Sequence, residues 1–390
     1  MYKKIGKRFV SPFREFISDS RAVGITLIFC TLVSLIVSNG DSGTAYIHFW
    51  EQARVLPFSN LHLPHSFLHF INDALMAVFF FLAGLEIKRE LIAGELSSFK
   101  KSALPIIAAI GGMVIPALFY MLWCGGTPYS RGWGIPMATD IAFSLGVLSL
   151  LGRKAPFSFR VFLTALAIID DLGGIVLIGL FYAGELNGIY LGLAAAVFAV
   201  LLLLNIFKVS SLYLYFLLGI GLWYFVFNSG IHATVAGVLL ALTIPLKKSA
   251  RLEQALHHPV SFIILPLFAL ANTAILLPGD IAPLLSSPLY MGVFIGLVVG
   301  KPLGIFLCSY AAVKLRLAEM PERMTYKDLL GIGMIAGIGF TMSVFIATLA
   351  FSDVQMQLTA KLAILMASAM AGILGYLYLL FLRKKERAHS

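Results

Sequence analysis

The stretch ALAIIDDLGGIVL, residues 165–177, places two adjacent acids, Asp170 and Asp171, inside a run that is otherwise almost entirely apolar. If this run crosses a membrane, each ionised side chain costs on the order of 2.5–3.5 kcal/mol even on lenient insertion scales, so acids at this depth indicate a function. Whether the run is a membrane span depends on the remainder of the chain.

The composition is that of a membrane protein with many spans. Of the 390 residues, 59% are hydrophobic and only 12% are charged, which is far from the usage of a soluble domain. The net charge of +10 could suggest a nucleic-acid partner, but the basic residues form short clusters between apolar runs, so we expect none. Cys30, Cys124 and Cys308 lie in separate apolar runs and form neither a disulfide framework nor a metal-binding pattern.

Runs of about 20 mainly apolar residues predict twelve transmembrane helices and hence an all-α fold. The predicted spans are 22–38, 67–86, 102–124, 134–151, 159–182, 187–206, 210–227, 230–245, 259–278, 287–312, 328–351 and 358–382. We treat residues 1–390 as a single transmembrane domain. The basic residues before the first span resemble the start of a secretory signal, but the long charged lead and the many later spans favour an uncleaved first helix.

Loop charges predict the orientation. With a cytoplasmic N-terminus, Arg54 and Arg131 fall in outer loops, Lys301 and Lys361 fall in spans, and the remaining 25 of the 29 basic residues fall in inner segments. Such a bias is what the positive-inside rule requires. Residues 1–21 are then a cytoplasmic N-terminal segment and residues 383–390 a cytoplasmic tail.

Several polar groups are predicted to lie near the bilayer midplane. At a rise of about 1.5 Å per residue, Asp170 lies about 15 Å beyond Arg160, and Asp140 and Lys301 lie about 20 Å from the nearest inner basic residues. Thr341 lies about 21 Å beyond Lys327 by the same rise. A structural salt-bridge network would need balanced charge, whereas three acids here face one base. Two acids therefore remain to bind protons or a cation.

Two spans carry helix-breaking residues at this depth. The fourth contains GWGIPMATD, residues 132–140, and the eleventh contains GIGMIAGIGFTMS, residues 331–343. Unwound backbone at depth is tolerated where it lines a cavity or is buried in protein, and half-helix ends bring partial charges there. Asp140 could balance facing N-termini and Lys301 facing C-termini. The two spans are seven apart and cross in opposite directions, which fits an inverted repeat of spans 3–5 and 10–12 with discontinuous spans 4 and 11.

Seven motifs resemble the NhaA family of bacterial sodium/proton antiporters, from about residue 10 to residue 385. They are FINDALMAVFFFLAGLEIKREL (70–91), ATDIAFSLGVL (138–148), LAIIDDLGGI (166–175), SGIHATVAG (229–237), LPLFALAN (265–272), GKPLGI (300–305) and GIGFTMSVFIA (337–347). The inverted repeat is itself a known feature of that family.

The resemblance implies a secondary antiporter of the bacterial inner membrane, not an enzyme, that needs no cofactor. It would export Na⁺ or Li⁺ in exchange for H⁺ by alternating access, carry net charge and be activated at alkaline pH. Asp171 would be the central cation and proton site, Asp170 would pair with Lys301, and Thr139 and Asp140 would belong to the crossing of unwound segments. The residues matched to pH regulation are Glu86, Arg89, Glu90, Glu253 and His257.

The resemblance also implies a homodimer joined through the first outer loop by a β-hairpin within about residues 44–60. One departure is Gln254, where some relatives have histidine. The role of His232, in the IHAT segment, stays open because the residue lies at a span end.

The main alternative is a proton-coupled transporter of a small organic solute, which would share the acids and broken helices but needs a larger polar lining. A channel would show rings of acids or carbonyl filters, and an intramembrane aspartyl protease needs acids on separate helices. VGKPLG, residues 299–304, lacks the phosphate-loop pattern. His62, His65 and His69 have helical spacing that could hold a metal.

Overall fold

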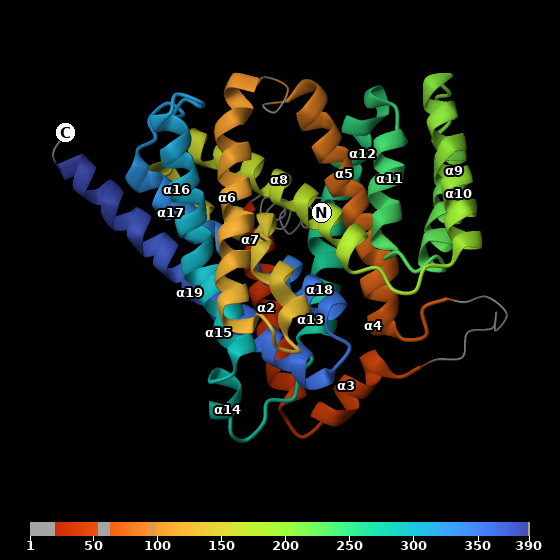
Figure 1. The fold of residues 1–390 in the computed structure, drawn as a ribbon, viewed down its shortest axis with the longest axis horizontal. Helices are drawn as coiled ribbons and strands as arrows, with labels where there is room; N and C mark the ends of the chain where they lie inside the picture. The colour runs from red at the N-terminus through yellow and green to blue at the C-terminus, as the bar shows by residue number, and fades with distance from the viewer. Residues whose placement is uncertain (1–19, 54–62, 95–96, 98, 389–390) are drawn as a thin grey trace, which may run out of the picture.

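The computed structural model describes residues 20–53, 63–94, 97 and 99–388. Within these residues the regular structure is helical, with no strand, and it forms one bundle (Figure 1). The predicted all-α membrane architecture is therefore confirmed.

The spans agree closely with the twelve predicted. In the described residues, nine helices are long and apolar enough to cross a membrane, and one further pair is bent by 51° at a break. Two shorter apolar helices, α10 and α11, account for the seventh and eighth predicted spans. The bounds of the helices of the first eight spans are α2 Ser20–Ser38, α4 Phe67–Phe70, η1 Ile71–Leu75, α5 Met76–Ala93, α6 Phe99–Cys124, η3 Ser130–Met137, α7 Ile141–Leu150, α8 Phe157–Phe181, α9 Gly188–Ile206, α10 Leu212–Phe227 and α11 Thr234–Thr243.

The last four spans contain further irregularities. Their helices are α12 Leu246–Pro259, η5 Val260–Ile264, α13 Leu265–Asn272, α15 Pro288–Ile295, η6 Gly296–Gly300, α16 Lys301–Lys314, α17 Tyr326–Ala336, α18 Phe340–Ala350 and α19 Val354–Ala388. The elements η1, η5 and η6 are π-helical turns inside spans two, nine and ten. Such turns are frequent at functional sites, and η6 ends directly before Lys301.

The ninth span begins earlier than predicted. It runs from Leu246 to Asn272 instead of starting at residue 259. The polar segment LKKSARLEQALHHP forms α12, which continues into the apolar helix through the turn η5. A scan for apolar runs cannot find this extension, because the helix pattern is amphipathic and the segment is charged.

The expected β-hairpin is wrong over the part of the first outer loop that is described. Gly43–Glu51 forms the helix α3, while residues 54–60 lie outside the described part. The helix is favoured because Tyr46 and Trp50, one turn apart, pack edge to face with ring centroids 5.9 Å apart. The Tyr46 hydroxyl also donates to Ser34 of the first span. Both α3 and the short helix α14, Ala282–Leu285, lie at one end of the bundle, at the bottom of Figure 1.

The two broken spans cross at their breaks. Residues 138–140 separate η3 from α7, and residues 337–339 separate α17 from α18. The Asp140 N–H donates to the Ile338 carbonyl at 2.7 Å, and the Ser343 hydroxyl donates to the Ile135 carbonyl at 2.8 Å. Backbone groups at both breaks are therefore paired with the other span, which is how irregular backbone inside a membrane is tolerated.

Candidate ion-binding site

Four spans contribute to a buried polar cluster at the crossing. The Lys301 ammonium lies 2.8 Å from Asp170 Oδ2, and neither side chain is exposed. Lys301 also donates to the Met137 carbonyl at the end of η3. The Thr139 hydroxyl lies 2.7 Å from the same Asp170 oxygen and 3.1 Å from the Ala336 carbonyl of α17. The cluster thus joins both broken spans to α8 and α16.

Asp140 caps two half-helices at once. Its Oδ1 accepts the Phe143 N–H of α7 at 2.9 Å, and its Oδ2 accepts the Thr341 N–H of α18 at 3.1 Å. The Thr341 hydroxyl donates to the same Oδ2. Because a helix N-terminus carries partial positive charge, one carboxylate here balances two such ends.

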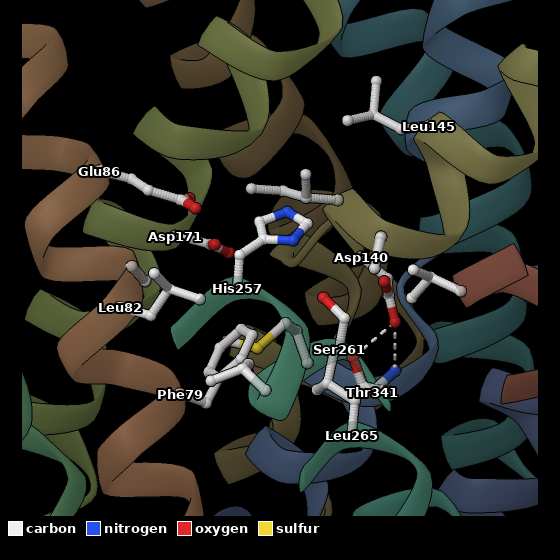
Figure 2. A pocket seen from close by; sticks show the side chains of 16 residues that line it. Phe79, Leu82, Glu86, Asp140, Leu145, Asp171, His257, Ser261, Leu265 and Thr341 are labelled. Carbon is white, nitrogen blue, oxygen red and sulfur yellow. Dashed lines mark hydrogen bonds between the residues drawn. The ribbon is translucent and has the colours of Figure 1, made fainter. Parts of the chain in front are cut away.

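Asp171 points into a cavity of about 130 Å³ that α8 shares with α5, α7, α12 and α18. Adjacent helix residues differ by about 100°, so Asp171 does not share the contact of Asp170 with Lys301. Its Oδ1 is buried and has no hydrogen-bond partner in the described part of the chain. Figure 2 shows Asp171, Glu86 and His257 together on one side of the cavity and the bonded pair Asp140–Thr341 on the other.

The residues matched to pH regulation gather at the side of this cavity formed by α5 and α12. Glu86 and His257 line the cavity itself. Arg89 lies 2.7 Å from Glu90 and 3.0 Å from Glu253, and so forms an ion-pair bridge between the two helices. The structure therefore brings all five residues to one region, next to Asp171.

The sequence reasoning missed Ser261. Its side chain lines the cavity beside Asp140 and Thr341 from the π-helical turn η5 (Figure 2). A hydroxyl within the apolar stretch that follows the charged segment of this span was the available signal. The turn that directs it inward could not be read from the sequence, because π-helical turns have no residue pattern of their own.

The sequence analysis also missed Asp73, for which the signal was an acid inside the second predicted span. It is buried, 2.8 Å from His69 Nε2 and 3.2 Å from His232 Nε2. His232, whose role the sequence left open, thus contacts a carboxylate. Of the three histidines with helical spacing, His69 pairs with Asp73, the His65 and His69 ring centroids lie 6.5 Å apart, and His62 lies outside the described residues.

The chemistry of the cavity suits a hard monovalent cation and protons. Carboxylate, hydroxyl and carbonyl oxygens are the ligands that hard cations prefer. Asp171, Asp140, Thr341 and Ser261 place such oxygens around one small cavity. Carboxylates are also proton acceptors, so the same atoms can bind either ion.

The comparisons with known proteins agree with this geometry. The model of the family described as Na+/H+ antiporter 1 matches residues 14–379. The chain is 49% identical over 382 residues to a Na(+)/H(+) antiporter NhaA 2 from Flavobacterium johnsoniae, covering 96% of this chain and 94% of that protein. It is 48% identical over 373 residues to a Na(+)/H(+) antiporter NhaA from Cytophaga hutchinsonii, covering 94% of each chain. It is 47% identical over 375 residues to a Na(+)/H(+) antiporter NhaA from Escherichia coli O1:K1, covering 94% of this chain and 97% of that protein. The buried acids, the crossed broken helices and these matches together place the chain in the NhaA family of Na⁺/H⁺ antiporters.

Proposed function

We propose that the protein exports Na⁺, and also Li⁺, in exchange for protons across the bacterial inner membrane, with Asp171 as the central binding group. The observation that carries the proposal is the buried Asp171 carboxylate in the cavity beside the crossing, one oxygen of which has no hydrogen-bond partner among the residues that the structure describes. Its neighbour Asp170 is held by Lys301. Such exchange would support salt tolerance and pH homeostasis.

Competition between the two ions would couple their transport. Two adjacent carboxylates in a low-dielectric site resist double ionisation and titrate as a coupled set. A proton and a sodium ion then compete for the same oxygens. If the site changes its exposure only when it is loaded with one or the other, exchange is obligatory. Two carboxylates can return more protons than sodium ions per cycle, so we infer that transport carries net charge.

The size of the cavity favours an ion over an organic solute. A volume of about 130 Å³ is well below the roughly 300–1,000 Å³ of sites for drug-sized molecules. The alternative, a proton-coupled transporter of a small organic solute, would need a larger cavity than the one observed.

Everted membrane vesicles with an acidic interior, read by a pH-sensitive dye, test the proposal. Addition of NaCl or LiCl, but not KCl, should release protons from wild-type vesicles at pH 7.5–8.5, and Asp171→Asn should abolish the response. A lack of any cation response at every pH would reject the antiporter. Exchange that survives in Asp171→Asn would place the site on another residue.

We further infer that the ion pairs between α5 and α12 set the pH at which transport begins. Arg89 bridges Glu90 on α5 to Glu253 on α12, one turn away from Glu86 in the cavity. Replacing Glu253 by Gln removes one negative charge from the cluster next to the cavity, so fewer like charges oppose the negative state of the cavity.

Transport by Glu253→Gln should consequently begin at lower pH than wild type, with unchanged sodium dependence at the pH of full activity. Gln254→Ala, at the adjacent exposed position of α12, is the matched control and should keep the wild-type profile. An unshifted profile in Glu253→Gln, or an equal shift in both variants, would argue against regulation by this cluster. The homodimer through the first outer loop, which the family resemblance implies, is a separate proposal that this experiment does not test.

A further inference from the structure

A second and larger cavity lies on the other side of α7. It measures about 510 Å³ and is formed by α2, α7, α18 and α19. On α7 its lining residues are Phe143, Val147 and Leu150, whereas Ile141, Ala142 and Leu145 line the ion cavity. At about 100° per residue, the two sets lie on nearly opposite faces of this half-helix. We call the second cavity the α19 groove.

The α19 groove is apolar and opens to the outside of the bundle. Leu32, Leu150 and Ile373, on three of its walls, are each more than half exposed. Two hydroxyls in its wall are already engaged: Thr31 donates to the Leu27 carbonyl at 2.8 Å, and the Ser368 hydroxyl accepts the Phe340 N–H at 3.2 Å. The surrounding helices are membrane spans, so lipid tails are the molecules that meet this opening.

The length of the groove and the basic residues beyond one of its ends indicate which lipid it fits. Its α19 wall runs from Leu365 to Tyr376, about 16 Å at the rise of a helix, close to half of the roughly 30 Å hydrocarbon core. Beyond Leu150 at one end, the chain turns through Gly152–Lys154, which the loop charges place at the cytoplasmic surface. Basic residues at that surface attract anionic headgroups.

We propose that the α19 groove binds one acyl chain of an anionic phospholipid from the inner leaflet, with the headgroup beside Lys154. Because bulk lipid is equally apolar, selectivity must come from the fit of the chain and from the headgroup charge. The chain would lie against Phe143 and Phe340, whose rings are in edge contact at 5.4 Å. These residues belong to the first turns of α7 and α18, so the lipid supports the helix crossing from the side opposite the ion cavity.

Photocrosslinking tests this site without any transport measurement. The full-length protein is reconstituted into bilayers containing phosphatidylglycerol or phosphatidylcholine with a diazirine near the end of one acyl chain, and the labelled peptides are identified by mass spectrometry. We expect the anionic phosphatidylglycerol probe to label residues 143–150 and 365–376 several-fold more than the phosphatidylcholine probe does. Lys154→Ala should remove that difference.

Adjacent residues of α19 provide a matched pair of variants. Ile373 lines the groove and is 57% exposed, whereas Leu374 does not line it and is 42% exposed. Ile373→Trp should lower labelling of 143–150 several-fold, and Leu374→Trp should leave it unchanged, with both variants melting at the wild-type temperature. Equal labelling of other lipid-facing helices such as α9, an equal effect of both variants, or crosslinks to a second copy of the chain would each overturn the proposal.

Discussion

The ion pair between Lys301 and Asp170 is the most deeply buried charge contact in the described part of the site, since neither side chain is exposed. A buried pair is tolerated because each charge compensates the other, whereas removal of one partner leaves an uncompensated charge. In this protein Thr139 adds only a hydroxyl to the Asp170 carboxylate, which cannot replace the ammonium.

Lys301→Gln should therefore destabilise the protein by about 3–5 kcal/mol, seen as a lower melting temperature in detergent. The double variant Asp170→Asn with Lys301→Gln should recover much of the loss, because it carries no unpaired charge. Arg89→Gln is the control: its partner Glu253 belongs to a pair in which the arginine is 40% exposed, and such pairs contribute about 0–1 kcal/mol. A double variant that melts no higher than Lys301→Gln would show that the pair is not the source of the loss.

At the residue scale, the sequence predicted the depth of these groups, and the family resemblance predicted the pairing of Asp170 with Lys301, but neither predicted the bond between Asp140 and Thr341. Distances from the inner basic residues placed Asp140, Asp170, Lys301 and Thr341 at one level, and in the structure they form two pairs at the helix crossing, Asp170 with Lys301 and Asp140 with Thr341. The bond between Asp140 and Thr341 joins residues 201 positions apart. Such a contact depends on how two broken helices cross, which no spacing within one span determines. The same estimate of depth, applied to the second span, would have identified Asp73 as a buried acid.

Among the helices, α6 and α16 make an unusually close approach, one from each half of the predicted inverted repeat. A Cβ added at Gly304 would overlap the Gly111 carbonyl oxygen, and a Cβ added at Gly111 would overlap the Gly304 carbonyl oxygen. Small residues allow membrane helices to approach in this way. Lys301 lies one turn before Gly304 on α16, so this contact also positions the ammonium.

Gly304→Ala should accordingly separate α6 from α16 and cost about 1–3 kcal/mol, as overpacking does, together with a loss of sodium-dependent proton release. Gly221→Ala, in α10 where the added Cβ meets open space, should be neutral or stabilising by about 0.5–1 kcal/mol. Melting temperatures measured for both purified variants check this. If Gly304→Ala melts like Gly221→Ala, the close approach does not limit the packing.

The element boundaries also show what hydropathy can and cannot predict. The first span was predicted as 22–38 and runs from Arg21 to Ser38, because its ends coincide with the ends of apolar sequence. The start of the ninth span was missed by thirteen residues, because α12 is charged along its length. Helix α3 was missed because the β-hairpin was expected from the family resemblance, whereas Tyr46 and Trp50 stand at helical spacing and pack on each other.

For the whole molecule, the loop charges predict that the α16–α17 connection is cytoplasmic and the connection before α14 is external. Asp280 and Glu319 lie in these two connections, and both are exposed. Their opposite placement follows from the count of spans between them, so a single error in that count would put both on one side.

Cysteine labelling can decide the orientation. In a background with Cys30, Cys124 and Cys308 replaced by serine, Asp280→Cys should react with a membrane-impermeant maleimide in intact spheroplasts, whereas Glu319→Cys should react only in everted vesicles. The reason is electrostatic: translocating the basic inner loops is disfavoured, and the α16–α17 connection carries Arg316 and Arg323 beside Lys314. Labelling of both variants from the same side would mean that the number of spans between the two sites is even, not one as predicted. A miscount of the short helices α10 and α11 could not explain that result, because both helices precede both sites. Labelling of each from the unexpected side would instead invert the whole bundle and make the Glu86 side of the ion cavity external.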